Sequence, residues 1–159
     1  LLRYDNRGDP EASTMVAGRQ LFAWRTRFWS VGAKLPLGNI ELLAQAMDGS
    51  TAFEPVPGLY LDSRFSAGYL LAGWNPGGAW QAALRMDWFR IRQLPETLDA
   101  PLNEHGNALT AAINWRPREH WRVSGELLRI DSTRDQRTEE GRKPPQVDLQ
   151  AQLSLRWFF

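Results

Sequence analysis

The C-terminal end of the chain alternates between apolar and polar residues. Every second position is apolar, namely Val147, Leu149, Ala151, Leu153, Leu155, Trp157 and Phe159. The residues between them are polar except for Phe158. A period of two predicts a β-strand with one apolar and one polar face. This strand is much longer than the roughly five or six residues that are common in soluble sheets.

The same period recurs upstream, in segments separated by turn-forming residues. These segments are residues 22–28, 61–73, 80–88, 109–115 and 121–127. In the first of them the apolar residues occupy even positions up to Phe28, whereas from Val31 onward they occupy odd positions. Such a change of phase predicts a β-bulge near Phe28 and Trp29. Residues 39–47 fit either a strand or a short helix capped by Asn39, and the neighbouring strands favour the strand.

The connections between these segments alternate in length. Short turns are expected at residues 36–39, 75–78 and 116–119, and long polar connections at residues 48–58, 92–105 and 131–145. This alternation is typical of outer-membrane barrels, which have short periplasmic turns and long external loops. The sequence therefore predicts an all-β fold, an antiparallel up-and-down transmembrane β-barrel, with about seven or eight strands in this chain.

The chain is expected to form a single β-barrel domain over residues 1–159. Residues 1–4 resemble the end of a strand that is already under way, and Leu1 is not an initiator methionine. We therefore expect the chain to be the C-terminal portion of a longer barrel.

Tryptophans gather beside the predicted short turns. Trp74 and Trp80 flank one turn, Trp115 and Trp121 flank another, and Trp157 lies near the C-terminus at the same predicted level. Amphipathic rings are most stable at a membrane interface, so these positions predict an aromatic girdle. The alternative is a soluble core filled by these rings, and it would place them in the middle of strands.

Composition excludes several other classes of protein. The longest nearly apolar run, residues 68–74, is far shorter than the roughly 18 to 20 residues of a membrane-spanning helix. A spanning β-strand needs only about 9 to 11 residues, of which every second one is apolar. The formal net charge of +1 gives no indication of nucleic-acid binding, and the absence of cysteine excludes a disulfide framework.

No catalytic or metal-binding constellation stands out in the sequence. The two histidines, His105 and His120, are expected at opposite ends of the barrel, which argues against a shared metal or nucleophile site. We therefore expect a protein that is not an enzyme, with no catalytic residue, no metal and no cofactor.

Charged residues are expected on the inward face of the barrel. The predicted pore-lining residues are Arg25, Arg27, Arg64, Arg85, Asp87, Arg122, Glu126 and Arg156. A lumen that carries so many charges has to be wet or tightly paired, because burying unpaired ions is costly. A modest preference for anions, caused by the arginines, is a hypothesis that follows from this set.

The last residues resemble the β-signal that ends outer-membrane β-barrel proteins. The matching positions are Gln152, Ser154, Trp157 and Phe159, with serine where that signal usually has glycine. The resemblance implies a bacterial outer-membrane protein whose last strand is recognised by the barrel assembly machinery. A free strand edge can be recognised in this way because it can pair by β-augmentation.

Two further segments resemble the closing hairpin of phosphate-selective-type porins. They are residues 105–117 and residues 120–132, and the looser resemblance extends over residues 60–159. It implies a barrel of about sixteen strands, of which this chain would be roughly the last half.

These observations favour an outer-membrane porin that passively conducts small hydrophilic solutes or ions through a charged lumen. Its expected partners are outer-membrane lipid and lipopolysaccharide, the assembly machinery and further copies of itself. One alternative is a complete eight-stranded outer-membrane barrel with a structural or binding role. Another is a soluble ligand-binding β-barrel. A lipid-modifying enzyme is a weaker alternative, because no nucleophile–base pair is apparent.

Overall fold

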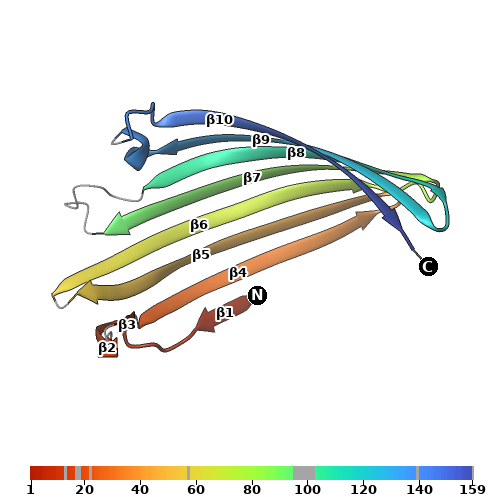
Figure 1. The fold of residues 1–159 in the computed structure, drawn as a ribbon. Coiled ribbons are helices and arrows are strands. Elements are labelled where there is room, and N and C mark those ends of the chain that lie inside the picture. The colour runs from red at the N-terminus through yellow and green to blue at the C-terminus, as the bar shows by residue number, and fades with distance from the viewer. Residues whose placement is uncertain are drawn as a thin grey trace.

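The computed structural model describes residues 1–12, 14–16, 19–21, 23–56, 58–94, 103–138 and 140–158. These residues form an eight-stranded antiparallel sheet in the order β1-β4-β5-β6-β7-β8-β9-β10, and a separate two-stranded sheet, β2-β3 (Figure 1). The strands are β1 (Leu2–Asp5), β2 (Thr14–Val16), β3 (Arg19–Leu21), β4 (Trp24–Leu37), β5 (Ile40–Val56), β6 (Leu59–Trp74), β7 (Trp80–Leu94), β8 (Glu104–Arg118), β9 (Trp121–Arg134) and β10 (Pro145–Trp157). Two short 3₁₀ helices, η1 (Pro10–Ala12) and η2 (Asp135–Thr138), complete the described elements.

The all-β, antiparallel, up-and-down prediction is confirmed. From β4 to β10 each strand of the large sheet pairs with the next along the chain. Residues 40–47, whose sequence fitted a strand or a helix, lie in β5 and pair with strands on both sides. No helix of the described residues is long and apolar enough to span a membrane.

The predicted β-bulge near Phe28 and Trp29 is absent. Strand β4 pairs with β5 in one unbroken register from Trp24 opposite Phe53 to Leu37 opposite Ile40. Register shifts occur elsewhere, between Phe53 and Val56 of β5 and between Trp115 and Arg118 of β8. The backbone of β4 is therefore continuous where the apolar phase changes, so Arg25 and Arg27 share a face with Val31 and Leu35.

One of the predicted long connections is also wrong. Residues 48–56 belong to β5, so only residues 57–58 join β5 to β6. Strand pairing continues through this polar segment because its backbone groups still find partners on β4 and β6. The turns at residues 38–39, 75–79 and 119–120 lie at the end of the sheet where the chain terminates (Figure 1). We call the half of the sheet next to these turns the short-turn half, and the other the far half.

The large sheet is a single layer that has no hydrophobic core of its own. It curves and twists from β1 at one edge to β10 at the other (Figure 1). Among the described residues, only Ala52 and Leu61 are buried hydrophobic side chains, and no large side chain is fully buried. The described strands do not close into a barrel, because β1 and β10 remain at opposite edges. Such a sheet depends on its surroundings to cover its apolar side chains.

Candidate functional site

The strand registers assign every paired side chain to one of two faces, because residues directly opposite each other project to the same side. Two successive cross-strand rows on one side are entirely apolar, and we call this side the apolar face. The first row is Leu35, Leu42, Ala72, Leu84, Ala111, Leu127 and Ala151. The second row is Leu37, Ile40, Trp74, Ala82, Ile113, Gly125 and Leu153.

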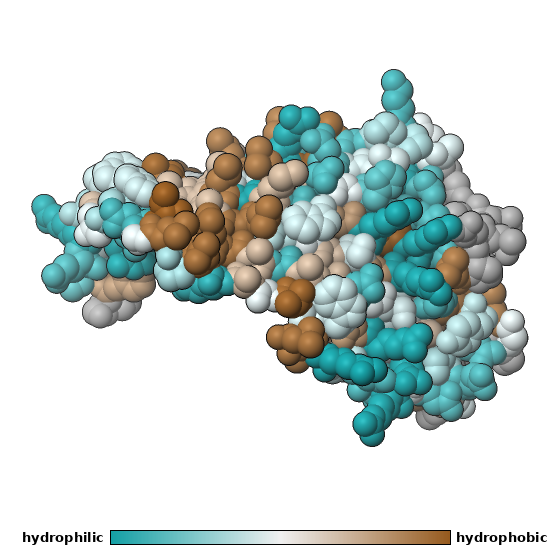
Figure 2. Space-filling model, turned by 180° about the vertical axis from the view of Figure 1, so that it is seen from behind, coloured by the Kyte–Doolittle hydropathy of each residue, from teal (hydrophilic) through white to brown (hydrophobic). Residues whose placement is uncertain are grey.

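Side chains of the apolar face are highly exposed. Leu70 is 55% exposed and Leu153 is 80% exposed. Figure 2 shows hydrophobic side chains gathered in a band, with hydrophilic side chains to either side of it. A continuous apolar surface over so many strands is unusual for a soluble monomer, in which the largest patch covers about 300 to 600 Å².

The predicted girdle tryptophans all lie on the apolar face, beside the short turns. Trp80 stacks on Trp115 with ring centroids 5.5 Å apart, and Trp121 stacks on Trp157 at 5.8 Å. Trp74 lies on the same face one strand away from Trp80 and is 47% exposed. The register thus brings together rings that the sequence placed beside separate turns.

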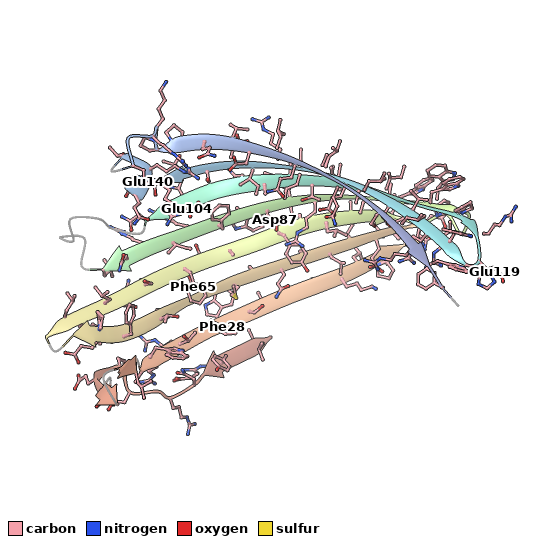
Figure 3. All side chains as sticks on the ribbon, viewed as in Figure 1. Phe28, Phe65, Asp87, Glu104, Glu119 and Glu140 are labelled. Atoms are coloured by element: carbon pink, nitrogen blue, oxygen red, sulfur yellow. The ribbon has the colours of Figure 1, made fainter. Side chains whose placement is uncertain are left out.

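The opposite side, which we call the polar face, carries a charged cluster at its middle. The guanidinium of Arg85 donates to both carboxylate oxygens of Asp87, with Nε at 2.9 and 3.0 Å. The same guanidinium lies over the ring of Tyr69, 4.1 Å from its centroid. Lys34 and Glu41 form a second ion pair at 2.5 Å on this face. Figure 3 shows Asp87 near the middle of β7.

Near the short turns the polar face holds two opposed arginines. Arg122 of β9 lies directly opposite Arg156 of β10, an arrangement that is destabilising for like charges. The Nε of Arg122 is buried without a hydrogen-bond partner, and its guanidinium lies 5.8 Å from the ring centroid of Phe158. Glu126 lies opposite Gln152. Neither guanidinium forms a direct ion pair with a carboxylate of the described residues, so this part of the polar face carries uncompensated positive charge.

Five of the eight residues predicted to line a pore share the polar face. These are Arg85, Asp87, Arg122, Glu126 and Arg156. The other three, Arg25, Arg27 and Arg64, lie on the side of the apolar face. Arg25 and Arg27 were misplaced because the predicted bulge is absent. Arg64 lies opposite Ser50 on the side of the apolar face, whereas Tyr69 of the same strand faces Arg85 and Asp87 on the polar face.

The misplaced arginines lie in the far half, beyond the apolar rows. Arg25 is bound to Asp5 through Nη2 to Oδ2 at 2.7 Å and Nε to Oδ1 at 3.1 Å. The hydrogen bond from Arg25, followed by one from the backbone N–H of Arg7, lowers the pKa of Asp5 from 3.8 to about 2. Bonding to Asp5 raises the pKa of Arg25 in turn.

The residues of the predicted insertion signal lie on the edge strand β10. Gln152 and Ser154 are on the polar face, opposite Glu126 and Ser124, and Trp157 is on the apolar face. Phe159 lies outside the described residues. The register of β10 with β9 leaves the other edge of β10 without a partner strand among the described residues. Such an edge has the geometry for pairing with a further strand.

The histidines lie at opposite ends of the sheet. His105 is opposite Thr133 in the far half, and His120 is in a short turn, where its Nδ1 is 3.1 Å from the carbonyl oxygen of Phe158. No group of three histidine, aspartate or glutamate side chains among the described residues could hold a metal ion. A scan against protein-family models finds no match for this chain, and searches of curated proteins and of solved structures find no significant match either.

Proposed function

We propose that this chain forms part of the wall of an outer-membrane β-barrel porin, with the apolar face toward lipid and the polar face toward a water-filled lumen. The observation that carries the proposal is the division of a single-layer sheet into one mainly apolar and one charged face. The charged side chains of β9 that lie within the apolar band, Arg129 and Asp131, are paired with each other. A second protein layer would have to cover several rows of leucine and tryptophan side chains. Lipid covers such a surface without any further protein, and strands in a membrane can satisfy their backbone groups by pairing with each other.

The height of the apolar face matches the thickness of the apolar band of outer-membrane barrels. On β7 it extends from Trp80 to Trp88, which is about 26 Å along a strand at roughly 3.3 Å per residue. A tilt of about 40° reduces this to roughly 20 Å across the membrane, close to the ~25 Å apolar band of such barrels. Beyond Trp88 the same face turns polar, with Asp48, Ser66 and Arg90 in one cross-strand row.

Transport would depend on charge and size without chemistry. The polar face offers the Arg85–Asp87 pair at mid-height and the opposed Arg122 and Arg156 near the short turns. A pore lined in this way filters solutes by electrostatic attraction and by its width. The proposed barrel is completed by further strands that pair with the edges of β1 and β10. Its resemblance to phosphate-selective-type porins makes small anions the first solutes to test.

Ion conductance tests the proposal directly. The protein extracted from its membrane in detergent and added to a planar bilayer should produce discrete conductance steps. Arg85→Gln should shift the reversal potential toward cations, because it leaves Asp87 as an unpaired negative charge in the lumen. Arg129→Gln is the matched control: it breaks the Arg129–Asp131 pair on the apolar side and should leave the reversal potential unchanged.

Three results would contradict a porin. Stable insertion without conductance would favour a complete small barrel with a structural or binding role. A protein that remains monodisperse without detergent would favour a soluble ligand-binding barrel. Equal shifts for Arg85→Gln and Arg129→Gln would show that the two faces are not separated as proposed.

A further inference from the structure

The apolar face becomes basic two rows beyond its apolar rows, past a mixed row of Trp29, Asp48, Ser66 and Arg90. Arg27 of β4, Ser50 of β5, Arg64 of β6 and Arg92 of β7 form one cross-strand row in the far half. Neighbouring strands are about 4.8 Å apart, so Arg27 and Arg64 are separated by roughly 10 Å with Ser50 between them. A depression of about 440 Å³ opens here, and its lining includes Arg3, Arg25, Arg27, Ser50 and Arg64. We call it the arginine groove.

The charges of the groove do not cancel. Four arginines line it, Arg3, Arg25, Arg27 and Arg64, against two carboxylates, Asp5 and Asp48. Only Arg25 is engaged by one of these carboxylates, because it binds both oxygens of Asp5.

Two of the remaining guanidinium groups keep donors available. Arg27 donates from Nε to the hydroxyl of Ser50 at 3.3 Å, and this neutral hydroxyl does not offset the positive charge of Arg27. Arg64 approaches Asp62 only to 3.7 Å, and its side chain is 68% exposed. Arginine has five N–H donors in a planar fork, so both groups can still bind an anion in a bidentate manner.

The groove is held in shape from behind. Phe28 and Phe65 project to the other side of the same strands and approach each other across Gly49, with ring centroids 6.5 Å apart (Figure 3). Tyr4 stacks on Phe28 at 5.2 Å and so attaches β1 to this cluster. A site whose backbone is already ordered loses less conformational freedom on binding.

The position of the groove along the strands identifies the kind of ligand. Over β4 to β7, the last apolar row is Val31, Ala46, Gly68 and Trp88. Arg27 is four residues beyond Val31, which corresponds to about 13 Å along the strand and roughly 10 Å across a membrane at the expected tilt. The headgroup layer adds about 5 to 8 Å on each side of the hydrocarbon, and arginine side chains can reach back toward it. Trp29 and Val31, both exposed, provide apolar contact between the groove and the acyl region.

We propose that the arginine groove binds the phosphate groups of a phosphorylated lipid in the leaflet around the far half of the sheet. This inference rests on the proposed membrane function, because it needs the apolar face to lie against lipid. Arg27 and Arg64 bind the phosphate oxygens through paired N–H donors, and the hydroxyl of Ser50, which lies between them, donates a further hydrogen bond to the phosphate. A soluble anion would bind less well, because it gains nothing from the apolar surface next to the groove.

Lipid retention in a defined membrane tests this proposal. The complete protein is reconstituted in phosphatidylcholine vesicles that contain either lipid A with both phosphates or lipid A from which they were removed. Lipid carried into detergent with the protein is then counted by native mass spectrometry. The unmutated protein should retain the phosphorylated form in preference to the dephosphorylated one.

The double variant Arg27→Gln/Arg64→Gln should retain about tenfold less phosphorylated lipid A, because two charge-assisted contacts are lost. Arg27→Lys/Arg64→Lys should give an intermediate value, since lysine keeps the charge but not the fork. Arg129→Gln is the matched control on the same face, outside the groove, where the arginine is already paired with Asp131 at 3.1 Å. Its retention should equal that of the unmutated protein.

Several results would overturn the groove as a lipid site. They are equal retention of both lipids, equal loss for Arg129→Gln, and binding of inorganic phosphate by the groove without retention of lipid A. Conductance of the same preparations separates this failure from failure of the proposed function. A protein that conducts but retains no lipid A refutes only the groove, whereas a protein that never enters the vesicles refutes both.

Discussion

The two halves of the sheet distribute their side chains in opposite ways on the same continuous strands. In the short-turn half, leucines and tryptophans occupy one face, and Arg85 and Asp87 the other. In the far half, Phe28 and Phe65 have moved to the polar side, while the arginine row occupies the side of the apolar face. Since β4 contains no bulge, the backbone has not turned over. In the proposed membrane, the surrounding medium changes along the strand, because lipid ends and water begins on the outside.

A charge in the middle of the apolar rows should have the largest effect. Leu84→Arg places a guanidinium at the centre of the surface that we propose faces lipid, where such substitutions cost about 2 to 4 kcal/mol. Gln81→Arg, three residues away on the polar face, should cost far less because water reaches it. Urea unfolding of both variants in lipid vesicles measures the difference. Equal destabilisation would mean that the two faces have the same surroundings.

The far half should be sensitive to a methyl group at Gly49. A Cβ there would lie 2.5 Å from the Cβ of Phe28 and 2.8 Å from Cζ of Phe65, and it would also contact the carbonyl oxygen of Arg27. Gly49→Ala should therefore cost about 1 to 3 kcal/mol, as overpacked sites do. Gly125→Ala is the control in the short-turn half, where the nearest atom is Cγ2 of Ile113 at 3.6 Å. A similar free energy of unfolding for the two variants would refute this difference in packing between the halves.

The stacked tryptophans beside the short turns test whether neighbouring rings at this end of the sheet stabilise each other. Trp121 and Trp157 lie nearly parallel, with an interplanar angle of 7°. A double-mutant cycle with Trp121→Ala and Trp157→Ala should give a coupling energy of about 0.5 to 1.5 kcal/mol, the value typical of aromatic pairs. The free energies come from the same unfolding experiment. A coupling near zero would show that the two rings act independently at the interface.

The sequence predicted the short-turn half well, because a single rule applies there throughout. Leucines of one face alternate with polar residues of the other, so the period of two predicted the strands and placed Trp80 and Trp115 beside the short turns. The far half obeys two rules at once. Phe28 and Phe65 are aromatic yet lie on the polar side, and Arg64 is charged yet lies on the side of the apolar face. Only the pairing register shows this, because neighbouring strands fix which face a residue occupies.

The smallest expected effect is a local titration at the edge of the far half. The pKa of Asp5 is lowered to about 2 by Arg25 and by the backbone N–H of Arg7, so the pair is fully formed above about pH 4. Its contribution to stability is lost as the pH falls below 4 and through the folded pKa near 2, because protonation removes the charge that Arg25 binds.

Carboxyl ¹³C NMR of labelled protein should report a midpoint for Asp5 near 2. Arg25→Gln should raise that midpoint toward 3.8, though not fully, because Arg7 still donates at 2.9 Å. Arg129→Gln breaks the Arg129–Asp131 pair of β9, far from Asp5, and should leave the midpoint of Asp5 unchanged. An ordinary midpoint in the unmutated protein would mean that β1 is not held against β4 by this pair, and the arginine groove would then lose the edge strand that supplies Arg3 and Asp5.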